Sequence, residues 1–441
     1  MKSNIAIFFL IFSMYSCQKK EETKSQVKSE KMNTELKSVV ENYYEDRLKF
    51  FPLDATVNGD NRYNDTLPND ISESFRSKLQ DFYQNNLTLL NNINSQELSD
   101  QDLLTYEILK REITIALEGL EFNDHYMPIQ QFWGTALTFP QLGSGQSSQP
   151  FKTPEDYENF LGRIDDFSVW ADTAIGNMKK GLASKETFPK VLMEKVLPQF
   201  KAMVVDDPKK SLFYEPIKNL PNSFTAEDKE RITFAYFKAI KDKVIPAYKR
   251  LHDFIKTEYI PQTRTSTGFF DIPNGKERYD YWIKYWTTTN LSANEIYEIG
   301  LEEVARIRSE MEKVREQVGF KGDLKAFFEH VNTDPKFKPF KTDEEVINAF
   351  KNIEQKMQPQ LKKLFSMVPK TKFEVRQTEE FREASASAEY MQGTPDGSRP
   401  GIFYVPKIGS GCGNAHKGMD KRKGNSIYES ERSHFGAGCN C

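Results

Sequence analysis

Apolar residues recur every three or four positions through most of this chain, which is the spacing of one face of an α-helix. The clearest helix starts at Ser292-Ala-Asn-Glu295, a capping box, and should end at Gly319. Its apolar stripe is Ile296, Ile299, Val304, Ile307, Met311, Val314 and Val318. A second capping box, Thr342-Asp-Glu-Glu345, predicts another helix. Because such stripes must be buried, the pattern predicts a large multi-helix body.

Further helices are expected at residues 35–51, 72–94 and 103–117, in a segment that starts at Thr153, and at residues 225–259. Pro52 should end the first of these, and Pro246 should kink the last. Extended segments are expected only near the end of the chain, at Phe373–Gln377 and around a Pro-Asp-Gly turn that leads into Ile402–Val405. The predicted fold class is therefore mainly α, with a small β-sheet near residues 373–405.

The N-terminus has the form of an export signal. Lys2 precedes the apolar run Ile5–Phe12, which is too short to span a bilayer as a mature helix. Residues 1–17 end in Cys17 after a small residue, an arrangement that resembles a bacterial lipobox; a secretory signal with an incidental cysteine is the alternative. Residues 18–34, rich in Lys, Glu and Ser, are expected to form a disordered tether. We expect an acylated Cys17 to hold the protein to the lipid bilayer of the cell envelope, periplasmic or surface-exposed.

Charge and cysteine usage exclude two classes of protein. A net charge of −3 gives no positive field for nucleic acid. No cysteine lies between Cys17 and Cys412, so the body has no disulfide framework. The 33 Phe and 19 Tyr residues indicate large buried surfaces instead.

Motifs for metal or nucleophilic chemistry are missing from the sequence. None of the five histidines is followed by glutamate, and His125, His252 and His330 are expected to be structural. A zinc knuckle could be drawn from Cys412, His416, His434, Cys439 and Cys441, but that segment has few apolar residues to surround a metal. No Walker loop or serine-nucleophile elbow is found. We therefore assign no catalytic or metal-binding residue.

Two segments have both a structural and a functional interpretation. Tyr279, Trp282 and Trp286 share one face of an expected helix, and they form either part of the core, which is favoured, or a platform for sugar or peptide. Ser144 lies in the Gly- and Ser-rich segment 143–150, which is either a flexible linker, again favoured, or a gate over a cleft.

Several ordered blocks resemble the bacterial domain-of-unknown-function family 885. They are residues 43–59, 181–183, 189–193, 287–306 and 396–405. The resemblance covers about residues 35–405 and implies an exported lipoprotein with a zincin-like (gluzincin-type) body and peptide-bond hydrolysis. In that family a strand like Gly401–Val405 is followed by a helix with a His-Glu-x-x-Pro-Gly-His-His element, whose histidines would hold Zn²⁺. That element is absent here, so zinc is expected for full-length members but has no ligands in this chain.

The same analogy suggests where a peptide substrate would bind. Gly401–Val405 would lie along the cleft and pair with the substrate backbone, and Gly401 would allow close approach. Arg399 would either meet a carboxylate or be a surface charge in a turn. With Phe403 and Tyr404, these are the predicted substrate-binding residues.

Residues 406–441 lack apolar periodicity and do not resemble the body. Two main functional hypotheses follow; a serine or aspartyl hydrolase, whose residues cannot be assembled by spacing, is a minor third. In the first, the chain is an exported relative of zinc metallopeptidases that is truncated or frameshifted before the zinc motif. In the second, it is a non-catalytic helical lipoprotein that binds peptide or glycan.

Overall fold

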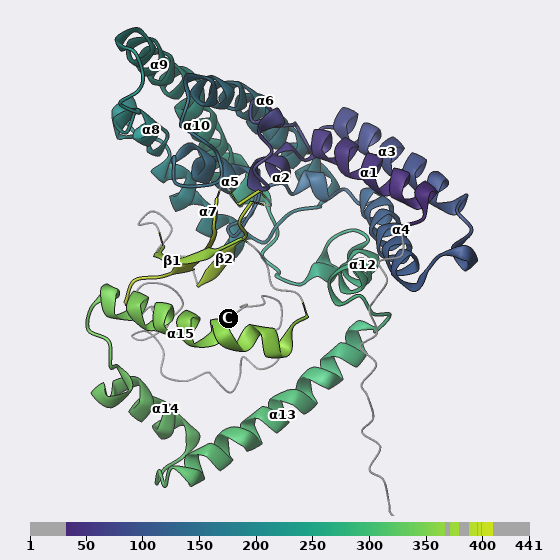
Figure 1. The fold of residues 1–441 in the computed structure, drawn as a ribbon, viewed down its shortest axis with the longest axis vertical. Helices are drawn as coiled ribbons and strands as arrows, with labels where there is room; N and C mark the ends of the chain where they lie inside the picture. Colours follow the sequence, from purple (N-terminus) through teal and green to yellow (C-terminus); the bar gives the residue numbers. More distant parts are fainter. Residues whose placement is uncertain (1–31, 367–370, 379–387, 395, 398, 409–441) are drawn as a thin grey trace, which may run out of the picture.

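The computed structural model describes residues 32–366, 371–378, 388–394, 396–397 and 399–408, which form a mainly α-helical fold with one small sheet (Figure 1). The helices of the body are α1 (Thr34–Phe50), α2 (Pro52–Val57), α3 (Glu73–Asn91), α4 (Asp100–Leu120), α5 (Thr135–Gly143), α6 (Pro154–Ser184), α7 (Lys190–Ala202), α8 (Glu215–Lys218), α9 (Ala226–Ala239), α10 (Ile245–Phe254), α11 (Ile260–Gln262) and α12 (Gly275–Thr287). Three more helices follow: α13 (Ala293–Gln317), α14 (Leu324–Thr333) and α15 (Asp343–Leu364). No helix within these residues is long and apolar enough to cross a membrane.

Helices α1, α3 and α4 form a bundle at one end of the body (Figure 1). Ser72 and Ser99 cap the starts of α3 and α4 by accepting hydrogen bonds from backbone N–H groups. The stripes expected on residues 35–51, 72–94 and 103–117 meet in one apolar cluster, in which the rings of Tyr43 and Phe82 stack at 5.2 Å. Pro52 ends α1 as expected, and it also starts α2.

The larger core surrounds the long helix α6. Thr153 and Asp156 form a reciprocal capping box at its start, and α7, α9 and α10 pack against the core that it joins. Phe139 and Phe167 stack at 4.3 Å, and both are fully buried. The aromatic content of the sequence is explained in large part by this core.

The segment expected to be one kinked helix is continuous but changes its pitch twice. A π-helical turn, Ile240–Val244, separates α9 from α10, and a second, Ile255–Tyr259, separates α10 from α11. Pro246 is the second residue of α10, just after the first π-turn, so the change of pitch falls next to the proline that was expected to disturb the helix. Tyr248 and Leu251 of α10 are fully buried against the core.

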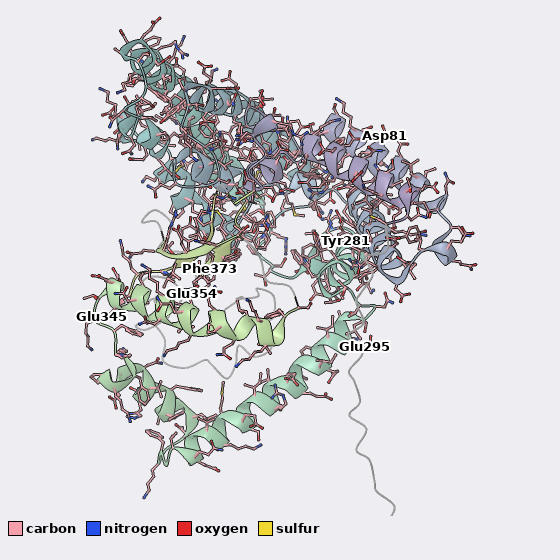
Figure 2. The ribbon with its side chains drawn as sticks, in the orientation of Figure 1. Asp81, Tyr281, Glu295, Glu345, Glu354 and Phe373 are labelled. Carbon is pink, nitrogen blue, oxygen red and sulfur yellow. The ribbon has the colours of Figure 1, made fainter. Side chains whose placement is uncertain are left out.

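Helices α13, α14 and α15 form an arm that projects from the body. In Figure 1, α13 and α14 meet at an angle, and α15 lies across the opening between them. The capping boxes expected at Ser292 and Thr342 are both present, and their partners Glu295 and Glu345 are labelled in Figure 2. None of the residues on these three helices is buried. The helices that start after Ser292 and Thr342 were therefore predicted correctly, but the burial of the α13 stripe was not.

The sheet has the strands β1 (Phe373–Gln377), β2 (Glu389–Met391) and β3 (Gly401–Val405), in the order β1-β3-β2. β3 pairs in parallel with β1 and antiparallel with β2. Gly397, with φ of +75°, lies in the turn between β2 and β3, where the Pro-Asp-Gly sequence predicted one. The N-terminus of α15 is joined to the end of this segment, because the backbone N–H of Ile408 donates to Asp343 Oδ1 at 2.8 Å.

Candidate functional site

A pocket of about 520 Å³ lies where the sheet meets the body. Its walls come from α2, from α5 and the loop after it, and from β2 and β3. The lining residues are Leu53, Val57, Thr138, Gln141, Leu142, Gln146, Ser147, Ser148, Glu389, Tyr390, Met391, Gln392 and Tyr404. Apolar side chains, amides and hydroxyls dominate this lining, and Glu389 is its one ionisable carboxylate. A second hollow, near Phe234 on α9, is larger but is lined mainly by charged surface side chains.

The loop after α5 is held in place by the side chain of Ser144. Its Oγ donates to the carbonyl oxygen of Gln141 at 2.7 Å and accepts from the N–H of Gln146 at 3.2 Å. Ser144 is only 2% exposed, so the favoured expectation of a flexible linker is wrong here. Gly145 follows with φ of +74°, which turns the chain so that Gln146, Ser147 and Ser148 line the pocket.

Polar contacts join the segment after β2 to the end of α2. Arg399 donates to the carbonyl oxygens of Val57 and Gln392, and Gln392 Nε2 donates to Asn58 Oδ1 at 2.6 Å. The guanidinium is half-buried, and this burial lowers the pKa of Arg399. Two blocks that carried the family resemblance, near residues 59 and 396, therefore meet in space. The guanidinium of Arg399 thus joins two backbone segments through hydrogen bonds to their carbonyl oxygens.

The other predicted substrate-binding residues lie on β3, which is the middle strand. Both of its edges are paired, so the expected addition of a substrate backbone to β3 is wrong; the outer strands are β1 and β2. Gly401 does allow a close approach, but the ring that approaches it belongs to Tyr390. Phe403 packs against Phe350 of α15 at 5.5 Å, and Tyr404 lines the pocket. Sequence reasoning missed the contribution of α2, α5 and β2, because nothing local in them signals a pocket.

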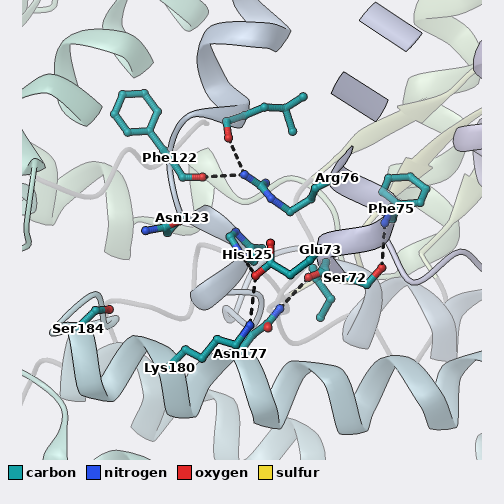
Figure 3. Close-up of polar contacts among 12 residues, drawn as sticks. Ser72, Glu73, Phe75, Arg76, Phe122, Asn123, His125, Asn177, Lys180 and Ser184 are labelled. Carbon is teal, nitrogen blue, oxygen red and sulfur yellow. Dashed lines mark hydrogen bonds and ion pairs between the residues drawn. The ribbon is translucent and has the colours of Figure 1, made fainter. Parts of the chain in front are cut away.

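A polar cluster joins α3, α6 and the 3₁₀ turn Asp124–Tyr126 (Figure 3). Glu73 Oε1 lies 3.3 Å from His125 Nε2 and 3.1 Å from Lys180 Nζ. His125 is 6% exposed, and burial lowers its pKa, with the positive charge of Arg76 acting in the same direction. Arg76 donates to the carbonyl oxygens of Leu120 and Phe122. His125 is thus a structural residue, as expected.

Beside this cluster, Arg278 of α12 meets two acids. Its Nη2 lies 3.1 Å from Glu186 Oε1, and its Nε lies 3.2 Å from Asp124 Oδ1. Glu186 also accepts hydrogen bonds from Ser184 Oγ at 2.8 Å and from Asn123 Nδ2. Burial raises the pKa of Asp124, against the opposing effect of Arg278. These contacts hold α12 against the body.

The aromatic face of α12 lies mainly at the surface. Trp282 and Trp286 stack with centroids 6.3 Å apart, and Trp286 is 70% exposed. Tyr279 is also exposed, next to Phe270 at 5.4 Å. The favoured expectation of a core cluster is therefore wrong, and the platform interpretation is the one that fits the exposure.

A zinc site does not fit the part of the chain that the structure describes, because no three His, Cys, Asp or Glu side chains within it are grouped to hold a metal. His252 contacts Asp253, and His330 lies near Asp334. Cys17 and the histidines and cysteines after residue 409 lie outside the described residues.

Comparison with known proteins identifies the family. A model of a bacterial protein family of unknown function, DUF885, matches residues 52–431. This chain belongs to the DUF885 family. The resemblance seen in the sequence is confirmed, and the match runs beyond Val405 into the segment that we set apart. The boundary at residue 405 stays a prediction.

Two crystal structures resemble this DUF885 chain. One, a protein from Colwellia psychrerythraea provisionally described as a lipoprotein, has a TM-score of 0.73 and 19% identity over 84% of this chain and 66% of that chain. The other, from Shewanella oneidensis, is described in the same way and as having unknown function. It has a TM-score of 0.56 and 16% identity over 87% of this chain and 67% of that chain. This chain thus spans about two-thirds of the length of each, and the likeness concerns the fold. No curated protein sequence matches the chain.

Proposed function

We propose that this DUF885 chain is a lipid-anchored protein of the bacterial cell envelope that binds extended peptide segments in the pocket beside β2. The anchor is supported by the lipobox-like sequence that ends at Cys17 and by the description of both structural neighbours as lipoproteins. Acyl chains on this cysteine would hold the protein at the bilayer through the tether of residues 18–34.

The position of β2 is the observation that carries peptide binding. β2 is an outer strand, and no further strand lies beside it in the described part of the chain. Residues 389–392 line the pocket in succession, so a peptide that adds to this edge would place a side chain inside it. Leu53, Val57 and Leu142 would contact an apolar side chain, while Gln141 and Gln146 offer amide groups to the peptide backbone.

We further propose that the chain descends from zinc metallopeptidases with a zincin-like body, and that its reading frame is shifted before the zinc-binding helix. The 441 residues contain no His-Glu pair, and the described residues group no metal ligands. Under this proposal peptides would be bound without hydrolysis, because the family's His-Glu element, which would hold zinc and activate water, does not occur in the sequence. Reading the coding DNA in the two other frames after the Val405 codon tests the frameshift: finding no His-Glu-x-x-Pro-Gly-His-His element in either frame would exclude it.

Peptide binding is tested by narrowing the pocket. Gln146 is exposed at the pocket wall, so Gln146→Trp should fill the pocket without disturbing the core. Its matched control is Gln96→Trp, at an exposed position in the turn before α4. With a fluorescent peptide panel, we expect binding to the wild-type chain and the control and at least a tenfold loss for Gln146→Trp. Equal binding by all three proteins would exclude this pocket.

Zinc content separates a binding protein from an intact peptidase. We expect the purified chain to contain far less than one zinc per molecule and to leave bound peptides uncleaved. Stoichiometric zinc together with chelator-sensitive cleavage would overturn both the non-catalytic proposal and the assignment of no metal ligands.

A second candidate function rests on the exposed aromatic face of α12. Trp282 and Trp286 present stacked rings of the kind that bind the apolar faces of sugars. Under this alternative Trp286→Ala would abolish binding to an oligosaccharide panel, whereas Gln146→Trp would leave it intact. Loss of peptide binding with Gln146→Trp alone favours the pocket beside β2.

A further inference from the structure

The arm formed by α13, α14 and α15 exposes an unusual amount of apolar surface. Along α13 and just after it, the exposed apolar side chains are Tyr297, Ile299, Leu301, Val304, Ile307, Met311, Val314 and Val318, each between 40% and 63% exposed. On the other two helices Phe328, Ile353, Met357 and Leu364 are exposed as well. Single exposed apolar residues are common, but contiguous rows of them mark a surface that contacts something else.

The row on α13 is ordered along one side of the helix. Val304, Ile307, Met311, Val314 and Val318 are spaced by three, four, three and four positions, which is the spacing of residues that pack against another helix. We call this row the seam. The remaining surface carries short-range ion pairs, such as Arg306–Glu303 at 2.6 Å and Lys313–Glu310 at 2.8 Å. Such pairs stabilise a helix only slightly, and most helices in proteins are stabilised by packing of their apolar side. We therefore expect another apolar surface to pack against the seam.

The lengths of the neighbouring structures point to what covers it. The Colwellia protein shares this fold over 84% of the present chain, yet about a third of that protein has no counterpart here. The Shewanella protein gives the same proportions. Each neighbour therefore shares most of this fold and has further polypeptide that could bury the seam.

We propose that the apolar face of α13–α15 is a docking surface for a polypeptide with its own apolar face, equivalent to the part of the Colwellia chain that has no counterpart here. This occupant is distinct from a peptide in the pocket beside β2. The body has its own buried cores, whereas none of the residues of α13, α14 and α15 is buried.

The first test is a burial measurement in the Colwellia crystal structure after superposition. We expect the side chains that align with Val304, Ile307, Met311 and Val314 to be buried, and their contacts to come from segments without a counterpart in this chain. Exposed side chains at these positions, or contacts only with segments that both chains share, would overturn the proposal.

The second test uses the full purified chain and two variants with the same change in net charge. Ile307→Lys with Val314→Lys alters the seam, and Ser309→Lys with Glu316→Gln alters the opposite side of α13. If the seam is uncovered in this chain, both variants should match the wild type in hydrogen exchange of residues 293–364 and in sedimentation coefficient. If a second copy covers it, the wild type and the control will sediment as dimers and the seam variant as a monomer, which would reject the proposed occupant.

Peptide binding separates this proposal from the function proposed above. Because the pocket and the seam are on different elements, the seam variant should bind the fluorescent peptide as the wild type does. A failure of Gln146→Trp to affect binding would exclude the pocket and leave the burial test of the seam unaffected.

Discussion

Arg278 Nη2 and Glu186 Oε1 lie 3.1 Å apart although 92 positions separate the two residues in the chain. The side chain of Arg278 is 1% exposed and that of Glu186 is 6% exposed, so the ion pair is shielded from water. It joins α12 to the turn after α6, and the guanidinium also lies over the ring of Phe122 at 5.5 Å. This pair, with Asp124, fixes how α12 and the arm beyond it leave the body.

Removing one partner of this ion pair should lower the stability of the folded chain. Arg278→Ala leaves Glu186 buried and Asp124 half-buried without their cation, and the loss of one partner of a buried pair typically costs about 3–5 kcal/mol. We expect the free energy of unfolding, measured in urea, to fall by an amount in this range. Lys276→Ala, which removes an exposed pair with Asp280, is the control and should change it by less than about 1 kcal/mol. Equal effects of the two substitutions would contradict the structural role of Arg278.

Gly401→Ala should disturb the sheet. A Cβ at this position would overlap the ring of Tyr390, which lies across the strand. We expect a loss of about 1–3 kcal/mol in the free energy of unfolding, as for other overpacking substitutions. Adding Tyr390→Ala should recover part of that loss by removing the ring. If the double variant is as unstable as the sum of the single ones, the two residues are not in contact.

The stability should depend on pH through His125. Burial lowers the pKa of His125 in the folded chain, while the unfolded value is about 6.5. Below that pH the unfolded chain binds the proton more readily, so stability falls as the pH falls. His125→Gln should therefore lose less stability between pH 7.5 and pH 5 than the wild type does, as measured by urea midpoints. If the urea midpoint of His125→Gln falls with pH as steeply as that of the wild type, this account is rejected.

The variant Arg399→Ala tests whether Arg399 joins two backbone segments or binds the carboxylate of a ligand. If Arg399 holds the carbonyl oxygens of Val57 and Gln392, the substitution Arg399→Ala should reduce the free energy of unfolding by about 1–3 kcal/mol. Peptides with a free and with an amidated C-terminus should then bind to the variant with the same ratio of affinities as to the wild type. A selective loss of binding by free-carboxylate peptides would show instead that Arg399 binds the substrate.

The helices could be predicted from sequence because their signals are local. Ser292 with Glu295 and Thr342 with Glu345 are three positions apart, and each pair satisfies donors within its own first turn. The burial of these helices could not be predicted in the same way. Tyr248 and Val314 both lie on apolar helical stripes, yet one is fully buried and the other is 48% exposed, because a core neighbour covers only the first.

The site was found only in part for a related reason. Tyr404 was expected at the site and does line the pocket, but Gln146 and Tyr390 were not identified as pocket residues. Arg399 was expected to face a ligand, and it contacts backbone more than 300 positions away. Contacts at such separations leave no periodic pattern in a single sequence.

The amino-acid sequence alone determined where several helices of this chain start, and that its late segment would form strands, because caps, prolines and apolar spacing act within a few residues. Only the tertiary structure decided which strand is central, which aromatic residues reach the surface, and that β2 and the loop after α5 enclose one pocket. Those outcomes depend on which distant surfaces exclude water from each other, and that is a property of the assembled chain.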